Sequence, residues 1–206
     1  GTIALQSNLI GGIGGQLAAG AGSVISQQGV TISGIVNTSG GGSLRPTNSG
    51  NNSLSGVTLN GNLDMASATA LERVINNLML NGAININNGS LLNFEGNQTL
   101  AGAGSIVFGA TGNNRVGVDG GGKTLTVASG VTISGANGTI GPGQLVNGSG
   151  NAIVNNGTIN SNGGGTIVIA GLDAGIINNG LLRAQNGTLN VSTALSGSGT
   201  LQVDAT

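Results

Sequence analysis

Short runs of alternating apolar and polar residues, separated by glycine- and asparagine-rich corners, make up most of the chain. The segments TLTV at 124–127, TIVI at 166–169 and TLNV at 188–191 are representative. They are rich in β-branched residues and apolar at every second position or more, which is the period of a strand with one buried face. The pattern therefore predicts an all-β chain.

Several motifs recur along the chain, and the last two copies of Asn-Asn-Gly begin 23 residues apart. GVTISG occurs at 29–34 and again at 130–135, and Asn-Asn-Gly occurs at 87–89, 155–157 and 178–180. Intervals of roughly 20 to 27 residues are typical of stacked repeats in which each unit contacts its neighbours. With about 22 residues per coil, the repeats predict a parallel β-helix, or β-solenoid, of about nine coils forming one domain over residues 1–206.

The stacked-coil hypothesis assigns roles to particular residues. Aliphatic side chains at equivalent strand positions are expected to face the interior in columns. These core residues are Ile159, Ile167, Ile169, Leu182, Leu189 and Val191. Asparagine and glycine at the corners are expected to adopt left-handed backbone conformations, and the asparagine amides to bond along the stack. These corner and ladder residues are Asn88, Gly89, Asn156, Gly157, Asn179 and Gly180.

Two segments depart from the pattern, and one alternative applies to the whole chain. Ser39 to Gly56 is polar and contains Pro46, so a protruding loop is expected there. Met65 to Leu80 fits strands around an Asn-Asn corner, with a short helix as the alternative. Nine Asn-Gly steps also allow antiparallel hairpins throughout, although hairpins leave the recurrence of like motifs unexplained.

Composition removes most catalytic chemistry. The chain has no His, Cys, Trp or Tyr, so thiol sites, histidine triads and zinc sites on imidazole or thiolate are excluded, and we expect no catalytic residues, cofactor or metal. Glu95 and Asp119 lie about one period apart, beside Arg115 and Lys123, and are the one candidate for a carboxylate pair acting on polysaccharide. The alternative is surface ion pairing of Asp119 with Arg115 and of Glu72 with Arg73.

Charge and hydropathy limit the partners. The net charge is -1, the aromatic content is 1% and no apolar run approaches the length of a membrane span. Nucleic acid is therefore not expected as a partner, and neither is a membrane-spanning segment. The strand-like ends, GTIAL and GTLQV, lack a polar cap, so we expect the stack to continue, either through more of the same polypeptide or through end-to-end association of copies.

The runs LNFEGNQTLAGAGSIVFG from Leu92, KTLTVASGVTISGANGTIG from Lys123 and INNGLLRAQNGTLNV from Ile177 carry a family resemblance. They resemble the repetitive β-helical passenger and surface proteins of bacteria: autotransporter and haemagglutinin-like adhesins, and β-helix surface proteins with a sorting signal. The resemblance implies a right-handed parallel β-helix, a secreted bacterial protein, and an extracellular or cell-surface location. It brings no catalytic residues with it.

Three functions remain open at this point. The first is a structural β-solenoid, a repeat protein serving as a subunit of a stalk, surface layer or biofilm-matrix filament. The second is an adhesin segment that binds a glycan or a cell surface, with Ser39 to Gly56 as its expected contact. The third is a β-helical enzyme acting on polysaccharide, which the small number of charged residues disfavours.

Overall fold

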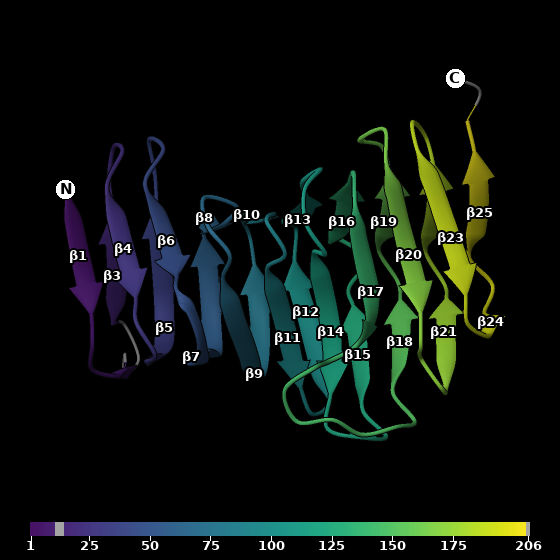
Figure 1. Cartoon of the computed structure of the whole chain (residues 1–206), viewed down its shortest axis with the longest axis horizontal. Helices are drawn as coiled ribbons and strands as arrows, with labels where there is room; N and C mark the ends of the chain where they lie inside the picture. The colour runs from purple at the N-terminus through teal and green to yellow at the C-terminus, as the bar shows by residue number, and fades with distance from the viewer. Residues whose placement is uncertain (11–14, 205–206) are drawn as a thin grey trace.

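The computed structural model describes residues 1–10 and 15–204, and this part of the chain contains strands and turns but no helix. Every strand pairing within it is parallel. The all-β prediction is therefore confirmed and the hairpin alternative is wrong. The chain winds as a β-solenoid of about nine turns. In Figure 1 the coils are stacked along the long axis, with the two termini at opposite ends.

One sheet, which we call face 1, receives a strand from each coil in chain order. Its strands are β1 (Thr2–Leu5), β4 (Val24–Gln27), β6 (Ser43–Pro46), β8 (Asn62–Met65), β10 (Ala83–Ile86), β13 (Ser105–Phe108), β16 (Thr132–Gly135), β19 (Thr158–Ser161), β22 (Leu181–Ala184) and β25 (Thr200–Val203). Most of these strands bury their second and fourth residues, and in β4, β8, β10, β13 and β16 the first and third are more exposed, as the alternation predicts.

A second sheet consists of two rows, which we call face 2 and face 3. Three long strands belong to both rows: β5 (Thr31–Thr38), β7 (Asn48–Asn60) and β9 (Leu71–Leu80). Face 2 also contains β2 (Leu9–Ile10), β11 (Leu91–Glu95), β14 (Arg115–Asp119), β17 (Gly138–Pro142), β20 (Thr166–Ala170) and β23 (Thr188–Ser192). Face 3 also contains β3 (Gln16–Ala19), β12 (Gln98–Gly102), β15 (Thr124–Val127), β18 (Ala152–Asn155), β21 (Gly175–Asn178) and β24 (Leu195–Ser196).

A single aliphatic column runs through face 1 from one end of the stack to the other. Strand register places these residues above one another: Ile3, Ile25, Leu44, Leu63, Ile84, Ile106, Ile133, Ile159, Leu182 and Leu201. The eight inner members are at most 2% exposed. Coils of different length thus keep the same residue class at this position, because a one-residue shift of register would turn the apolar side chains out of the core.

The predicted core residues follow this arrangement. Ile159, Ile167 and Ile169 are fully buried and Leu182 is 2% exposed, which confirms their interior placement. Leu189 and Val191 pack against the core but are only partly buried. Both lie on β23, which pairs only with β20 among the described residues, so they belong to the last coil of their face.

The two irregular segments turn out to belong to the stack. Ser39 to Gly56 does not form the expected loop: β6 and most of β7 lie within it, with Leu44 and Leu54 fully buried. Met65 to Leu80 ends in strand β9, and Asn76 and Asn77 have φ values of 60° and 67°, so the strand prediction with an Asn-Asn corner is confirmed and the helix is wrong.

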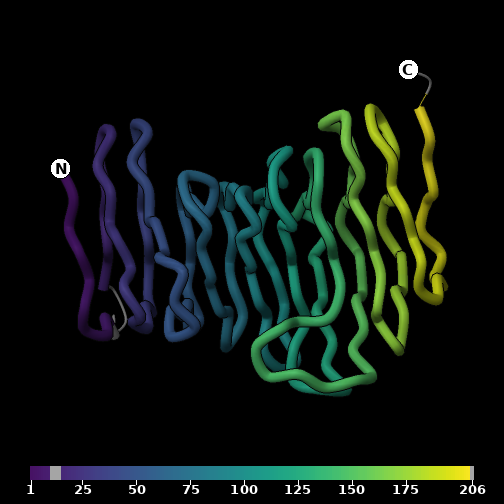
Figure 2. The backbone as a smooth tube through the Cα atoms, in the orientation of Figure 1, coloured from purple at the N-terminus to yellow at the C-terminus, as the bar shows by residue number. Residues whose placement is uncertain are grey.

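The segment that does leave the stack is Gly143 to Gly150, between β17 and β18. In Figure 2 it is the long green excursion at the lower edge, crossing in front of earlier coils. Its main chain is joined to those coils: Gly143 N donates to Val118 O at 2.6 Å, and Ser149 O accepts from Gly122 N at 2.7 Å. We call residues 143–150 the cross-coil loop.

Candidate functional site

The corner asparagines form hydrogen-bonded ladders between coils. Asn179 Nδ2 donates to Asn156 Oδ1 at 3.1 Å, as the ladder hypothesis expects, and the neighbouring Asn155 Nδ2 donates to Asn178 Oδ1 at 2.7 Å inside the structure. Asn88, with φ of 57°, donates from Nδ2 to the carbonyl of Ala66 in the preceding coil. These amides therefore satisfy the polar groups of one coil with those of the next.

The three predicted corner glycines are required for two different reasons. Gly89 has a φ of 78°, the left-handed conformation that was expected. Gly157 and Gly180, like Asn156 and Asn179 beside them, have no such φ, so that part of the expectation is wrong for these four residues. A Cβ atom on Gly157 would lie 2.3 Å from Val131 O, and one on Gly180 would lie 2.1 Å from Gly157 O. Glycine is needed there because the main chains of adjacent coils approach too closely for a side chain.

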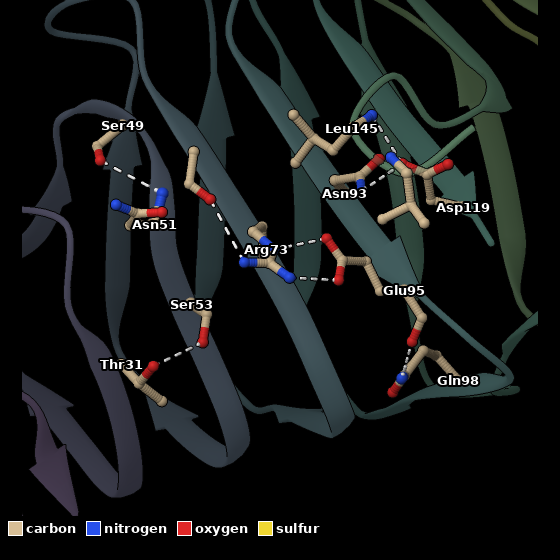
Figure 3. A network of polar contacts seen from close by, with 12 residues as sticks. Thr31, Ser49, Asn51, Ser53, Arg73, Asn93, Glu95, Gln98, Asp119 and Leu145 are labelled. Carbon is tan, nitrogen blue, oxygen red and sulfur yellow. Dashed lines mark hydrogen bonds and ion pairs between the residues drawn. The ribbon is translucent and has the colours of Figure 1, made fainter.

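Glu95 and Asp119 do lie together on face 2. They are register partners on β11 and β14, which confirms that they occupy adjacent coils. Strand β9 pairs with the other edge of β11. Figure 3 shows Arg73, on β9, directing its guanidinium at the Glu95 carboxylate. Arg73 Nε lies 2.5 Å from Glu95 Oε1, and Nη2 lies 2.6 Å from Oε2. Hydrogen bonding to Glu95 raises the pKa of Arg73, so the guanidinium is a permanent cation. Its two hydrogen bonds engage both oxygens of Glu95.

Asp119 holds the cross-coil loop. Its Oδ2 accepts from Leu145 N and Val146 N, each at 2.8 Å, and from Asn93 Nδ2 at 3.0 Å (Figure 3). The residue is 1% exposed. Burial alone raises the pKa of Asp119, but the hydrogen bonds from the Val146 and Leu145 amides and from Asn93 outweigh it, and the pKa is lowered.

Both expected surface ion pairs are wrong. Arg115 does not pair with Asp119: its Nη1 donates to Pro142 O at 3.1 Å. Glu72 does not pair with Arg73, because alternation along β9 turns it to the inside, where it is fully buried. Burial raises the pKa of Glu72 well above its ordinary value, although bonds from Gln27 and the Arg73 main chain oppose the rise. Lys123, expected beside the pair, contributes its main-chain N–H to Asn151 Oδ1.

The charged residues mainly link neighbouring coils. Arg45 on β6 bonds Asp64 on β8, with Nη2 and Oδ2 2.7 Å apart, and Arg183 on β22 bonds Asp204 just after β25. The Arg73–Glu95 pair links β9 to β11 in the same way. Within the described residues no group of three or more acidic, histidine or cysteine side chains is placed to hold a metal ion. The carboxylates thus serve contacts between coils and with the cross-coil loop.

The two ends of the stack present a different surface. At the C-terminal end Leu201 is 65% exposed and Val203 83% exposed, and Leu195 on β24 is 41% exposed. A shallow apolar hollow lies between them, lined by Leu182, Leu189, Val191, Leu195, Leu201 and Val203, with Ala184 and Gln202. At the other end Ile3, the first member of the face 1 column, is 60% exposed.

These features define a class: a parallel β-solenoid with asparagine ladders, inter-coil ion pairs and apolar end coils. Beyond that class, comparison with protein-family models, with curated proteins and with solved structures finds no match. No helix in the described part of the chain is long and apolar enough to cross a membrane.

Proposed function

We propose that this chain forms part of a non-enzymatic, extracellular structural β-solenoid in a bacterial surface or matrix filament or stalk, whose stack continues past both end coils through head-to-tail contact with further copies or through more of the same polypeptide. The observation that carries the proposal is the exposure of the face 1 column at its first and last members only. Ile3 and Leu201 are 60% and 65% exposed, whereas the eight members between them are at most 2% exposed. Covering both ends with another coil removes this apolar surface from water.

The edges of face 1 are suited to each other. Strand β25 carries Thr200-Leu201-Gln202-Val203 and β1 carries Thr2-Ile3-Ala4-Leu5, so a parallel pairing places Leu201 over Ile3 and Val203 over Leu5. Within the described part of the chain each edge strand pairs on one side only, and it presents main-chain donors and acceptors on the other. Because the contact joins two different surfaces, it repeats without closing and produces a filament.

The non-enzymatic part of the proposal is supported by the engagement of the carboxylates. Glu95 binds Arg73 through both oxygens, and Asp119 is covered by the cross-coil loop. The resemblance to bacterial β-helical surface proteins supports the extracellular setting. The test is incubation with neutral and uronate polysaccharides, with and without calcium, followed by product analysis. Turnover that disappears in Glu95→Gln or Asp119→Asn would overturn it.

Filament formation is tested on the purified chain by light scattering and negative-stain electron microscopy. The wild type is expected to grow into rods longer than one stack at micromolar concentration. Leu201→Lys places a charge in the proposed contact and should keep the chain monomeric. Met79→Lys is the matched control, because Met79 is also exposed but lies on face 3, away from the ends. A wild type that stays monomeric, or equal effects of both variants, would contradict head-to-tail stacking of copies.

A further inference from the structure

The cross-coil loop contains an Asn-Gly step, Asn147-Gly148, in a setting unlike the other eight such steps. Asn-Gly sequences lose ammonia when the glycine nitrogen reaches the asparagine side chain, and glycine offers no side chain to hinder that approach. Structure decides which steps react, because the reaction needs a side chain and a main chain that are free to reorient. The nine steps share one sequence, so any difference among them comes from the fold.

Seven of the nine asparagines have side chains held by hydrogen bonds. They are Asn60, Asn81, Asn88, Asn137, Asn156, Asn162 and Asn179. Most of these bonds run to the preceding or following coil, so breaking one disturbs the stack. The ladder that stabilises the solenoid therefore also holds these amides away from the reactive geometry.

Two asparagine side chains, Asn147 and Asn186, have no hydrogen-bond partner among the described residues. Asn186 is nevertheless fixed by its main chain: its N–H donates to Ser161 O at 3.2 Å and its carbonyl accepts from Gly164 N at 2.6 Å. Asn147 has neither bond, and the N–H of Gly148 also has no partner within the described part of the chain. Both residues are exposed. Asn147 is thus the one Asn-Gly asparagine with neither a side-chain nor a main-chain hydrogen bond to the described residues.

We propose that Asn147 is a site of spontaneous deamidation, with water as the only co-reactant. The main-chain nitrogen of Gly148 attacks Cγ of Asn147 and forms a five-membered imide. The bond from Cγ to the side-chain nitrogen breaks, and that nitrogen leaves as ammonia with the proton from Gly148. Water then opens the imide at one of its two carbonyls and yields aspartate or isoaspartate at position 147.

The product alters the attachment of the cross-coil loop. The loop is held by two carboxylates, Asp119 through Leu145 and Val146 and Asp173 through Gly150 N at 2.7 Å. A new negative charge in the loop adds to these two. Isoaspartate also lengthens the main chain before Gly148, whose Cα is so close to Gly121 that an added Cβ would lie 2.4 Å from the Gly121 nitrogen. The deamidated chain should therefore hold its loop less firmly.

The experiment is timed incubation of the folded protein in mildly alkaline buffer, with peptide mass spectrometry. Each event replaces the side-chain nitrogen of asparagine by oxygen and so raises the mass of the peptide. Cleavage after Lys123 and Arg183 gives a peptide that contains Asn137, Asn147, Asn156, Asn162 and Asn179. Fragment-ion sequencing is therefore needed to locate the change, and an isoaspartate-specific methyltransferase assay identifies the isomer. Position 147 is expected to convert several times faster than any of the other eight.

Two controls separate the effect of the fold from that of the sequence. In concentrated guanidinium all nine steps are expected to convert at similar rates, because the ladder is lost. Asn147→Gln should abolish the early mass gain, since glutamine forms the corresponding ring far more slowly, and Asn186→Gln should leave it unchanged. Early conversion at another position, or equal rates at all nine in the folded protein, would overturn the proposal.

Discussion

Gln27 Nε2 lies 3.4 Å from Oε1 of Glu72 in the interior of the stack, although the two residues are 45 positions apart in the sequence. Both side chains are fully buried, and the remaining side-chain oxygens, Gln27 Oε1 and Glu72 Oε2, have no hydrogen-bond partner among the described residues. A carboxyl group in this position is favoured in its neutral form, because ionisation would place an uncompensated charge in the core.

Glu72 should therefore make stability decrease with rising pH. The folded-state pKa is raised above the unfolded value of 4.5, so the folded state retains a proton that the unfolded state has lost. The contribution of Glu72 to the free energy of unfolding is fully present below the unfolded pKa. Above it the free energy of unfolding falls by up to about 1.4 kcal/mol per pH unit, until the folded pKa is passed. Glu72→Gln keeps the shape without the charge and should remove this slope. Denaturant unfolding over a pH series measures it, and identical slopes in the two proteins would contradict the expectation.

Asp119 should act in the opposite direction. Its pKa is lowered in the folded state, so its contribution is present above the unfolded value of 3.8 and is lost as pH falls through the folded pKa. Asp119→Ala leaves the N–H groups of Leu145 and Val146 without their acceptor, at a cost of about 1 to 3 kcal/mol. Limited proteolysis should then cut within the cross-coil loop.

The matched control for that variant is Glu95→Gln, which removes the neighbouring carboxylate but no bond to the cross-coil loop. It should leave the loop protected, whatever the loss of the partly buried Arg73–Glu95 ion pair costs in stability. Equal proteolysis of both variants would mean that Asp119 does not anchor the loop.

How far the sequence predicts this structure depends on whether a feature is local. Alternation is local, so strands, parallel stacking and the buried column were predictable, and the spacing of Glu95 and Asp119 correctly placed them in adjacent coils. The same alternation contained the signal for Glu72: in Leu71-Glu72-Arg73-Val74 the acid shares a face with Val74. The expected pairing with Arg73 ignored that signal.

Which segment leaves the stack of coils was not predictable in the same way. Ser39 to Gly56 and Gly143 to Gly150 are both rich in glycine and polar residues. The first stays in the stack because Leu44 and Leu54 fill column positions, whereas the second is held outside by Asp119, a residue one coil earlier. Which segment leaves the stack thus depends on contacts between coils that no single stretch of sequence reveals.

Close approach between coils should make some glycines irreplaceable. In Gly157→Ala the new Cβ would lie 2.3 Å from Val131 O and 2.6 Å from Ala128 O, so the coils must separate. We expect a loss of about 1 to 3 kcal/mol in the free energy of unfolding. Gly50→Ala is the control, because no atom lies within 4 Å of its added Cβ, and it should change stability by less than about 0.5 kcal/mol. Thermal or denaturant unfolding compares them, and a tolerated alanine at 157 would show that the coils can part there.

The face 1 column offers a test that joins stability to assembly. Ile159→Ala removes fully buried methyl groups between two neighbouring coils and should cost about 2 to 4 kcal/mol in the isolated chain. Ile3→Ala changes the same residue type in the same column where it is 60% exposed, so its cost in the isolated chain should be below about 1 kcal/mol. If copies stack through Ile3 and Leu201, Ile3→Ala should raise the protein concentration needed for filaments. The stability of the monomer should stay nearly unchanged in this variant. Dilution-series light scattering beside denaturant unfolding separates the two effects, and an Ile3→Ala chain that assembles as readily as the wild type would remove Ile3 from the contact.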